Sequence, residues 1–237
     1  MTDAFGYPFR GEQARPAWAA LAAFGVATAL CARFAVAFYP SVLALVPALL
    51  APVPLVLWAG YCRRVLSSTV ETGGKDDEMP AVGRLRDRFR DGVRALAVTL
   101  VYLTPPTLVL LVTLQGAASI GEEALDGGTG TVLVFGSTVT LSVALAVAYV
   151  YPAVLARDVA EGRRRPRLSP RGLLYVYRNP SYLVAWAAAF VVGLLGLGVV
   201  GQLFGGRGVP GLLAGLLAVY ASVVASRVVG LGYANAR

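Results

Sequence analysis

Apolar runs separated by polar and charged segments set the pattern of this chain. Each run is close to the roughly 20 residues that an α-helix needs to cross about 30 Å of hydrocarbon. The runs lack the period-two alternation of a membrane-spanning barrel. The pattern therefore predicts an all-α integral membrane protein, a single polytopic domain over residues 1–237. Its six transmembrane helices are expected at about 17–37, 42–61, 93–114, 131–151, 181–204 and 209–231.

Two charged segments, 62–92 and 153–180, lie between spans and are expected to form amphipathic cytoplasmic hairpins. In the first, an acidic cluster before Pro80 suits a helix start. Apolar residues then recur at spacings of three and four: Val82, Leu85, Phe89, Val93 and Leu96. This pattern indicates a helix lying on the bilayer surface. The alternative is a solvated helix that only joins two spans.

The 21 Lys and Arg residues are divided unequally between the two sides of the predicted bundle. All except Arg33 and Arg207 fall in the N-terminal tail, in residues 63–94, in residues 153–180 or at the C-terminal end. Basic residues mark the cytoplasmic side, so we expect a multi-pass protein of the cell membrane with both termini cytoplasmic. The tail, residues 1–16, is polar and is expected to anchor nothing. A net charge of +8 then reflects topology, and no nucleic-acid partner is expected.

Composition points the same way, with 57% hydrophobic and 14% charged residues against roughly 25% charged in a soluble domain. There is no His, and Cys31 and Cys62 fall near opposite membrane faces. No metal site, cofactor or disulfide is therefore expected. The predicted spans also lack Asp, Glu and Lys, which ion-coupled transporters place near mid-membrane. Coupled transport is disfavoured, and we do not expect an enzyme.

The third and fourth spans hold candidates for a permeation path. Pro105 and Pro106 remove two backbone donors, which predicts a kink or a break beside Thr104. Thr138 and Ser142 place hydroxyls along one stripe of the next span. Such a stripe either packs against a neighbouring helix or lines a cavity.

Arginines of the second charged segment are candidates for contact with anionic lipid headgroups at the cytoplasmic face. Each basic residue near a membrane surface contributes about 1 kcal/mol. The set is Arg163, Arg164, Arg165 and Arg167. Topology alone would also explain their position.

Glycines four residues apart mark the last two spans, at Gly201 and Gly205 and at Gly211 and Gly215. This spacing lets helices approach closely. We expect the sixth span to be a packing helix, and a homo-oligomer or membrane-protein partner to use these faces. The literal G-x-G-x-x-G that begins at Gly196 lies inside an apolar span, so it does not indicate a dinucleotide site.

A weak internal repeat relates the two charged segments. Val65-Leu66-x-x-x-Val70-x-x-Gly73 matches Val154-Leu155-x-x-x-Val159-x-x-Gly162. Either a duplication or chance in a biased sequence explains it.

Four short motifs resemble an archaeal family of multi-pass membrane proteins catalogued only as a domain of unknown function. They are Gly60-Tyr61-x-x-Arg64-Val65-Leu66, Pro80, Asp91-Gly92 and Tyr102-x-x-Pro105. The resemblance implies a membrane protein and supplies neither an activity nor site residues.

Three functions remain open. The leading hypothesis is a scaffold or interaction subunit with basic cytoplasmic surface helices. The second is a channel, permease or lipid-handling protein with a path between spans three and four. The third is an intramembrane enzyme, for which the sequence offers no nucleophile and base. A cavity reaching Thr104 and Thr138 would favour transport, and a solid bundle would favour the scaffold.

Overall fold

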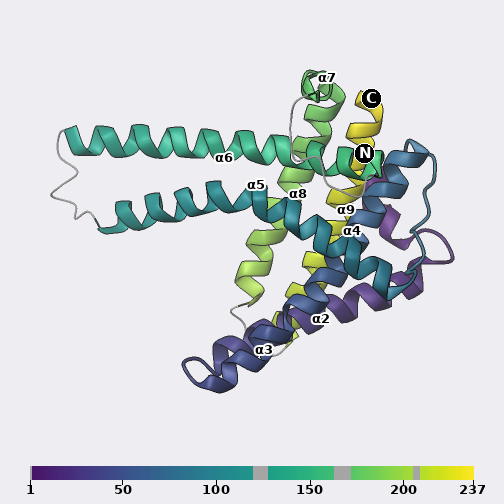
Figure 1. Ribbon diagram of the computed structural model, residues 1–237, viewed down its shortest axis with the longest axis horizontal. Helices are drawn as coiled ribbons and strands as arrows, with labels where there is room; N and C mark the ends of the chain where they lie inside the picture. The colour runs from purple at the N-terminus through teal and green to yellow at the C-terminus, as the bar shows by residue number, and fades with distance from the viewer. Residues whose placement is uncertain (1, 120–127, 163–171, 205–208) are drawn as a thin grey trace.

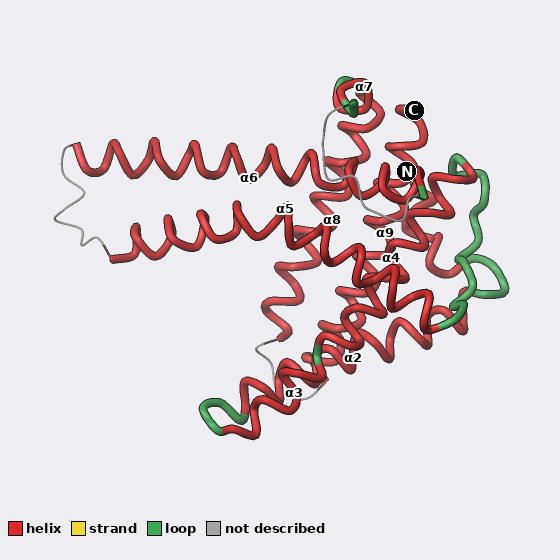
Figure 2. Tube along the Cα trace, in the orientation of Figure 1, coloured by secondary structure: helices red, strands yellow, loops and turns green. Residues whose placement is uncertain are grey.

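The computed structural model describes residues 2–119, 128–162, 172–204 and 209–237. Within these ranges every regular element is a helix, which confirms the all-α prediction (Figure 2). The elements are α1 Thr2–Gly6, η1 Tyr7–Phe9, α2 Ala14–Ala37, η2 Val42–Ala44, α3 Leu45–Leu50, α4 Pro52–Thr72, α5 Leu85–Ser119, α6 Gly128–Glu161, α7 Leu174–Tyr177, α8 Pro180–Phe204 and α9 Val209–Ala236.

Several helices are long and apolar enough to cross a membrane. Five such stretches are Ala14–Ala37, Val42–Thr72, Leu85–Thr113, Phe135–Glu161 and Val209–Ala236. A sixth apolar stretch, Pro180–Gly196 in α8, is shorter than these. The molecule is thus a multi-pass membrane protein, and five of the six predicted spans have a full-length counterpart.

The helices run further into the charged segments than hydropathy predicted. α4 continues to Thr72, α6 continues to Glu161, and α5 already begins at Leu85. Hydropathy detects where an apolar surface ends, whereas the backbone hydrogen bonds of a helix continue through polar residues. The predicted surface helix is therefore the first part of α5 and is continuous with the span. It begins at Leu85 and not at Pro80, which lies in the loop that joins α4 to α5. α5 reaches about 50 Å at 1.5 Å per residue.

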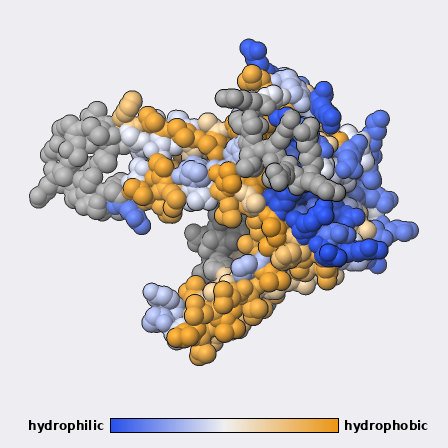
Figure 3. Space-filling view, in the orientation of Figure 1, coloured by the Kyte–Doolittle hydropathy of each residue, from blue (hydrophilic) through white to orange (hydrophobic). Residues whose placement is uncertain are grey.

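The helices form two arms that meet at one end of the molecule (Figure 1). α9 packs against α8, α4 and α2, while α5 and α6 pair into a long hairpin that projects away from the other helices. Both termini and α7 lie where the arms meet. Hydrophilic residues gather at this end and apolar residues cover the arms (Figure 3). We call it the polar end: the N-terminal residues, α7, and the adjoining ends of α4, α5, α6 and α9.

The double proline bends α5 without interrupting it. Pro105 and Pro106 lie inside the continuous helix, close to its midpoint in sequence. The axis of α5 changes direction along its length (Figure 1). A kink, the expected result of lost backbone donors, is thus what the chain adopts.

Glycines on α9 bring it against its neighbours within the chain. A Cβ at Gly215 would lie 2.9 Å from the carbonyl oxygen of Gly25 in α2, and a Cβ at Gly25 would lie 2.6 Å from Val219. The packing role predicted for the sixth span is confirmed. Since α2 occupies this face, Gly215 is not on a free surface for a second copy. Gly205 lies outside the described residues.

The internal repeat coincides with two helix ends. Gly73 follows α4 with φ +62°, and Gly162 follows α6 with φ +56°. Glycine adopts this left-handed conformation without a Cβ penalty, which makes it a common helix terminator. The matching Val65 and Val154 are both fully buried. The two repeats therefore share one structural role: each places a buried valine in the last turns of a helix that a glycine ends.

The N-terminal residues pack into the molecule, which corrects the expectation of a tail that anchors nothing. Tyr7 is 1% exposed. The hydroxyl of Tyr220 donates to the carbonyl oxygen of Phe5 at 3.0 Å, and the Met79 amide donates to the carbonyl oxygen of Arg10 at 3.3 Å. In this segment Ala4, Tyr7 and Pro8 are buried while Phe5 and Phe9 stay exposed, so part of its apolar surface packs against the bundle.

Candidate functional site

Two glycines set the closest contact between α4 and α5. A Cβ at Gly60 would overlap the carbonyl oxygen of Arg88, and a Cβ at Gly92 would overlap that of Val56. Glycine at both positions lets the two backbones approach as far as their carbonyl groups allow. The side chains next to these glycines are thereby brought together at the polar end.

Asp158 lies between two arginines in the resulting cluster. It accepts from Arg63 of α4 at 3.2 Å and from Arg94 of α5, and Arg63 also donates to Asp91 at 2.8 Å. The side chain of Asp158 is 1% exposed and that of Arg63 is 11% exposed. These four residues, which we call the clamp, join α4, α5 and α6. Removing one partner from such a buried group leaves an uncompensated charge and costs about 3–5 kcal/mol.

Arg227 of α9 is the second buried cation, and it is fully partnered. It donates to Thr69 at 3.1 Å and to both the Gly74 carbonyl oxygen and Asp77 at 3.0 Å. Its guanidinium carbon lies 4.5 Å from the centre of the Tyr7 ring. Burial raises the pKa of Tyr7, and the Arg227 cation acts in the opposite direction. Arg227 thus fastens the turn after α4 and the N-terminal segment to the bundle.

Arg88 is the third buried cation, and it differs from the other two. It is 2% exposed, and none of its three guanidinium nitrogens has a hydrogen-bond partner among the described residues. The guanidinium carbon of Arg88 lies 5.0 Å from the centre of the Tyr61 ring, which makes a favourable cation–π contact. A cation–π contact contributes about 0.5–2 kcal/mol, while burying an ion costs several kcal/mol. The charge of Arg88 is therefore not balanced within the described structure.

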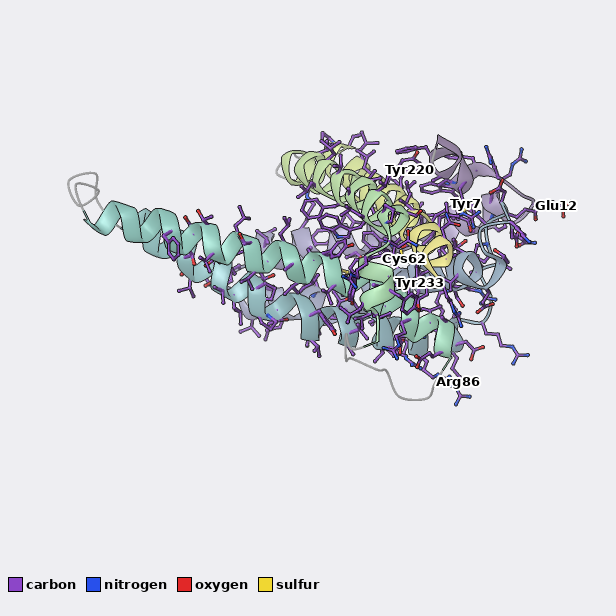
Figure 4. The ribbon with its side chains drawn as sticks, turned by 90° about the horizontal axis from the view of Figure 1, so that it is seen from above. Tyr7, Glu12, Cys62, Arg86, Tyr220 and Tyr233 are labelled. Carbon is purple, nitrogen blue, oxygen red and sulfur yellow. The ribbon has the colours of Figure 1, made fainter. Side chains whose placement is uncertain are left out.

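The outer side of α5 carries a different arrangement at the same end. Arginines and apolar side chains share this surface, which borders a groove of about 1020 Å³. We call it the α5 stripe: Arg84, Leu85, Arg86, Phe89, Arg90 and Val93. Leu85 is 59% exposed and Phe89 is 45% exposed. Figure 4 shows Arg86 reaching away from the body of the molecule.

An apolar pocket of about 360 Å³ lies further along the bundle, between α4, α5, α6, α8 and α9. Leu66, Leu103, Tyr151 and Phe190 are among its lining residues. The hydroxyl groups of Tyr151 and Thr99 are 2.7 Å apart at its polar-end side. The pocket fits an apolar chain better than a hydrated ion, because few polar groups face it.

The predicted path residues lie away from this pocket. Thr104, Thr138 and Ser142 are exposed on the projecting hairpin, and none of them lines the pocket. The Ser142 hydroxyl donates to the carbonyl oxygen of Thr138 at 2.8 Å, within α6. The proposed lipid contacts, Arg163, Arg164, Arg165 and Arg167, lie outside the described residues.

Sequence reasoning did not find the clamp or the buried arginines. It placed Asp158 in a cytoplasmic segment and Arg88 on the charged side of a surface helix. One signal was present: Asp158 follows the buried Val154 by four residues, so both lie on one face of α6. In the part of the chain that the structure describes, no group of three His, Cys, Asp or Glu residues could hold a metal ion.

Residues 41–206 match the family described as "Protein of unknown function (DUF4013)". The match covers more than half of the chain. The chain belongs to the DUF4013 family. The resemblance to a family of unknown function is confirmed at that level, while no curated protein and no solved structure is significantly similar to the chain. The clamp, Gly60, Gly92 and Arg88 lie inside the matched region, whereas Tyr7 and Arg227 lie outside it.

Proposed function

We propose that this DUF4013 protein is a non-enzymatic membrane interaction protein that gathers anionic lipids, and through them membrane partners, at its polar end. In this arrangement α8 is the sixth span, and the polar end and both termini face the cytoplasm of a cell membrane. Basic residues concentrated at this end support that orientation.

The α5 stripe is the observation that carries the proposal. Its arginines are exposed beside exposed leucine, phenylalanine and valine side chains, on a helix that enters the apolar zone directly. Apolar side chains at this depth insert among acyl chains while neighbouring cations attract anionic headgroups, at about 1 kcal/mol per basic residue. The apolar pocket supports the same role, because it offers an acyl chain a place inside the bundle.

Lipid retention during purification tests this role. Protein reconstituted with phosphatidylglycerol and phosphatidylcholine is extracted in mild detergent, and the lipids that remain bound are quantified by mass spectrometry. We expect wild type to retain phosphatidylglycerol preferentially, and a variant with Arg84, Arg86 and Arg90 changed to Gln to lose that preference.

A matched control changes three exposed arginines elsewhere on the polar end, Arg15, Arg178 and Arg237, to Gln. Its charge change equals that of the stripe variant, but the α5 stripe is left intact. We therefore expect this control to keep the preference for phosphatidylglycerol. Equal losses in the two triple variants, or no preference in wild type, would contradict a specific role of the α5 stripe.

A further inference from the structure

Arg88 carries hydrogen-bonding capacity that the chain leaves unused. A guanidinium has five N–H donors in a fixed planar fork, and it stays charged in proteins. The side chain of Arg88 extends from the first turns of α5 across Gly60 and over the Tyr61 ring. All three of its nitrogens lack a partner among the described residues.

The charged neighbour that acts on Arg88 is a second cation, Arg64 of α4. Arg64 is exposed, and its guanidinium rests against Gly83, which has φ +65° and no side chain in the way. Like charges that act on each other repel, and an anion bound near both relieves that repulsion. Arg64 and Gly83 therefore form the outer boundary of a strongly cationic position.

Nearby carboxylates of the chain are committed to other cations. Asp91 and Asp158 bind Arg63, and Asp77 binds Arg227. The Tyr61 hydroxyl donates to the Pro80 carbonyl oxygen at 2.9 Å, so it is engaged elsewhere. Among the described residues no carboxylate is hydrogen-bonded to Arg88, which leaves this position open to an external anion.

We propose that Arg88 and Arg64 form a binding site for a phosphate group, which enters beside Gly83 between α4 and the start of α5. Phosphate suits the site because its oxygens accept two parallel hydrogen bonds from a guanidinium fork. The group belongs either to an anionic phospholipid headgroup or to a soluble phosphate. Entry requires the exposed Arg64 side chain to turn outward, which opens the edge beside Gly83, where no Cβ obstructs it.

This site is distinct from the α5 stripe, so it does not rest on the proposed function. The stripe is exposed on the outer side of α5, whereas Arg88 is buried against α4. Changing the stripe arginines tests lipid gathering, and changing Arg88 or Arg64 tests the phosphate site. Either idea can fail while the other holds.

Thermal unfolding of the full-length protein in neutral detergent, followed by tryptophan fluorescence, tests the site. Inorganic phosphate and phosphatidylglycerol micelles are added in separate arms, with potassium chloride at equal ionic strength as the reference. We expect at least one arm to raise the Tm of wild type by about 3 °C or more over the reference. A response to inorganic phosphate assigns a soluble phosphate group, and a response to phosphatidylglycerol alone assigns a headgroup.

Arg88→Met should abolish this shift and, without added anion, unfold at a Tm equal to or above that of wild type, because it removes an unbalanced buried charge. Arg64→Gln should reduce the shift by more than half, while Arg178→Gln, which changes an exposed arginine outside both the α5 stripe and the proposed site, should keep it. The proposal is overturned if wild type shows no shift in either arm or if Arg88→Met retains it. Should Arg88→Met fail to fold, the comparison of Arg64→Gln with Arg178→Gln decides, and equal shifts in these two variants reject the site.

Discussion

At the scale of single residues, the polar end is organised by how each buried charge is balanced. Asp158 and Asp91 together balance Arg63 and Arg94 across three helices, and Asp77 pairs with Arg227. Paired in this way, the charges hold helices in register at little net cost, because their attraction offsets the loss of hydration. Arg88 is the exception, because it is buried without a carboxylate partner among the described residues. An anionic ligand would supply that partner, and the experiment on the proposed phosphate site tests this.

Asp158→Asn should destabilise the protein by about 3 kcal/mol or more, since Arg63 and Arg94 would keep their charges in a site without a full counter-charge. Unfolding in detergent micelles measures the free energy of unfolding of each variant. The exposed Asp87 provides the control, and Asp87→Asn should change that free energy by less than about 0.5 kcal/mol. Similar effects of the two substitutions would show that the clamp is not a stabilising element.

At the scale of elements, glycines decide which helices come close enough to share side chains. Gly60 and Gly92 let α4 and α5 meet at backbone carbonyl groups, and Gly25 and Gly215 do the same for α2 and α9. Dense packing of this kind depends on the absence of one methyl group at each position. The clamp follows from it, because Arg63 and Asp91 lie beside the glycines of the first pair.

Gly92→Ala should lower the free energy of unfolding by at least about 2 kcal/mol, because the new methyl group would meet the backbone of Val56, which cannot rotate aside. Gly136→Ala in α6 is the matched control, since a Cβ there meets nothing within 4 Å. Alanine's higher helix propensity should leave that variant as stable as wild type or up to about 1 kcal/mol more stable. A harmless Gly92→Ala would mean that α4 and α5 are not held at this distance.

At the scale of the whole molecule, two apolar arms converge on one hydrophilic end (Figure 3). Exposed leucines and valines along the arms suit contact with acyl chains, while arginines and carboxylates gather where the arms meet. The clamp, the α5 stripe and Arg88 all lie at this hydrophilic end, which the proposed function assigns to one side of the membrane.

Cysteine labelling of intact cells tests the orientation. In a background with Cys31 and Cys62 changed to Ala, single cysteines replace Gly73, Gly162 or Gly128. A membrane-impermeant thiol reagent should label position 128 directly, and positions 73 and 162 only after permeabilisation, because the proposed orientation places the basic segments in the cytoplasm. Labelling of position 73 or 162 in intact cells would reverse the assigned orientation.

The apolar runs determined, without any coordinates, that the chain is helical and spans a membrane several times. Helix spacing also revealed the packing role of α9, and Gly73 and Gly162 were visible as a repeat. These features are local, because each depends on residues within one or two turns. The helix ends were misplaced, since the length of an apolar run does not limit backbone hydrogen bonding.

Only the tertiary structure decided what the charged residues do. From the sequence, Asp158 and Arg63 fell in the predicted cytoplasmic segments, Arg227 fell near the cytoplasmic end of the sixth span, and residues 1–16 were expected to anchor nothing. Their burial depends on which helices come together, and that is set by contacts between residues far apart in the chain, such as Arg63 with Asp158. Hydropathy can be read from each residue alone, whereas the compensation of a charge depends on two residues that lie close together. The balanced clamp and the unbalanced Arg88 can therefore be recognised only after the helices have packed.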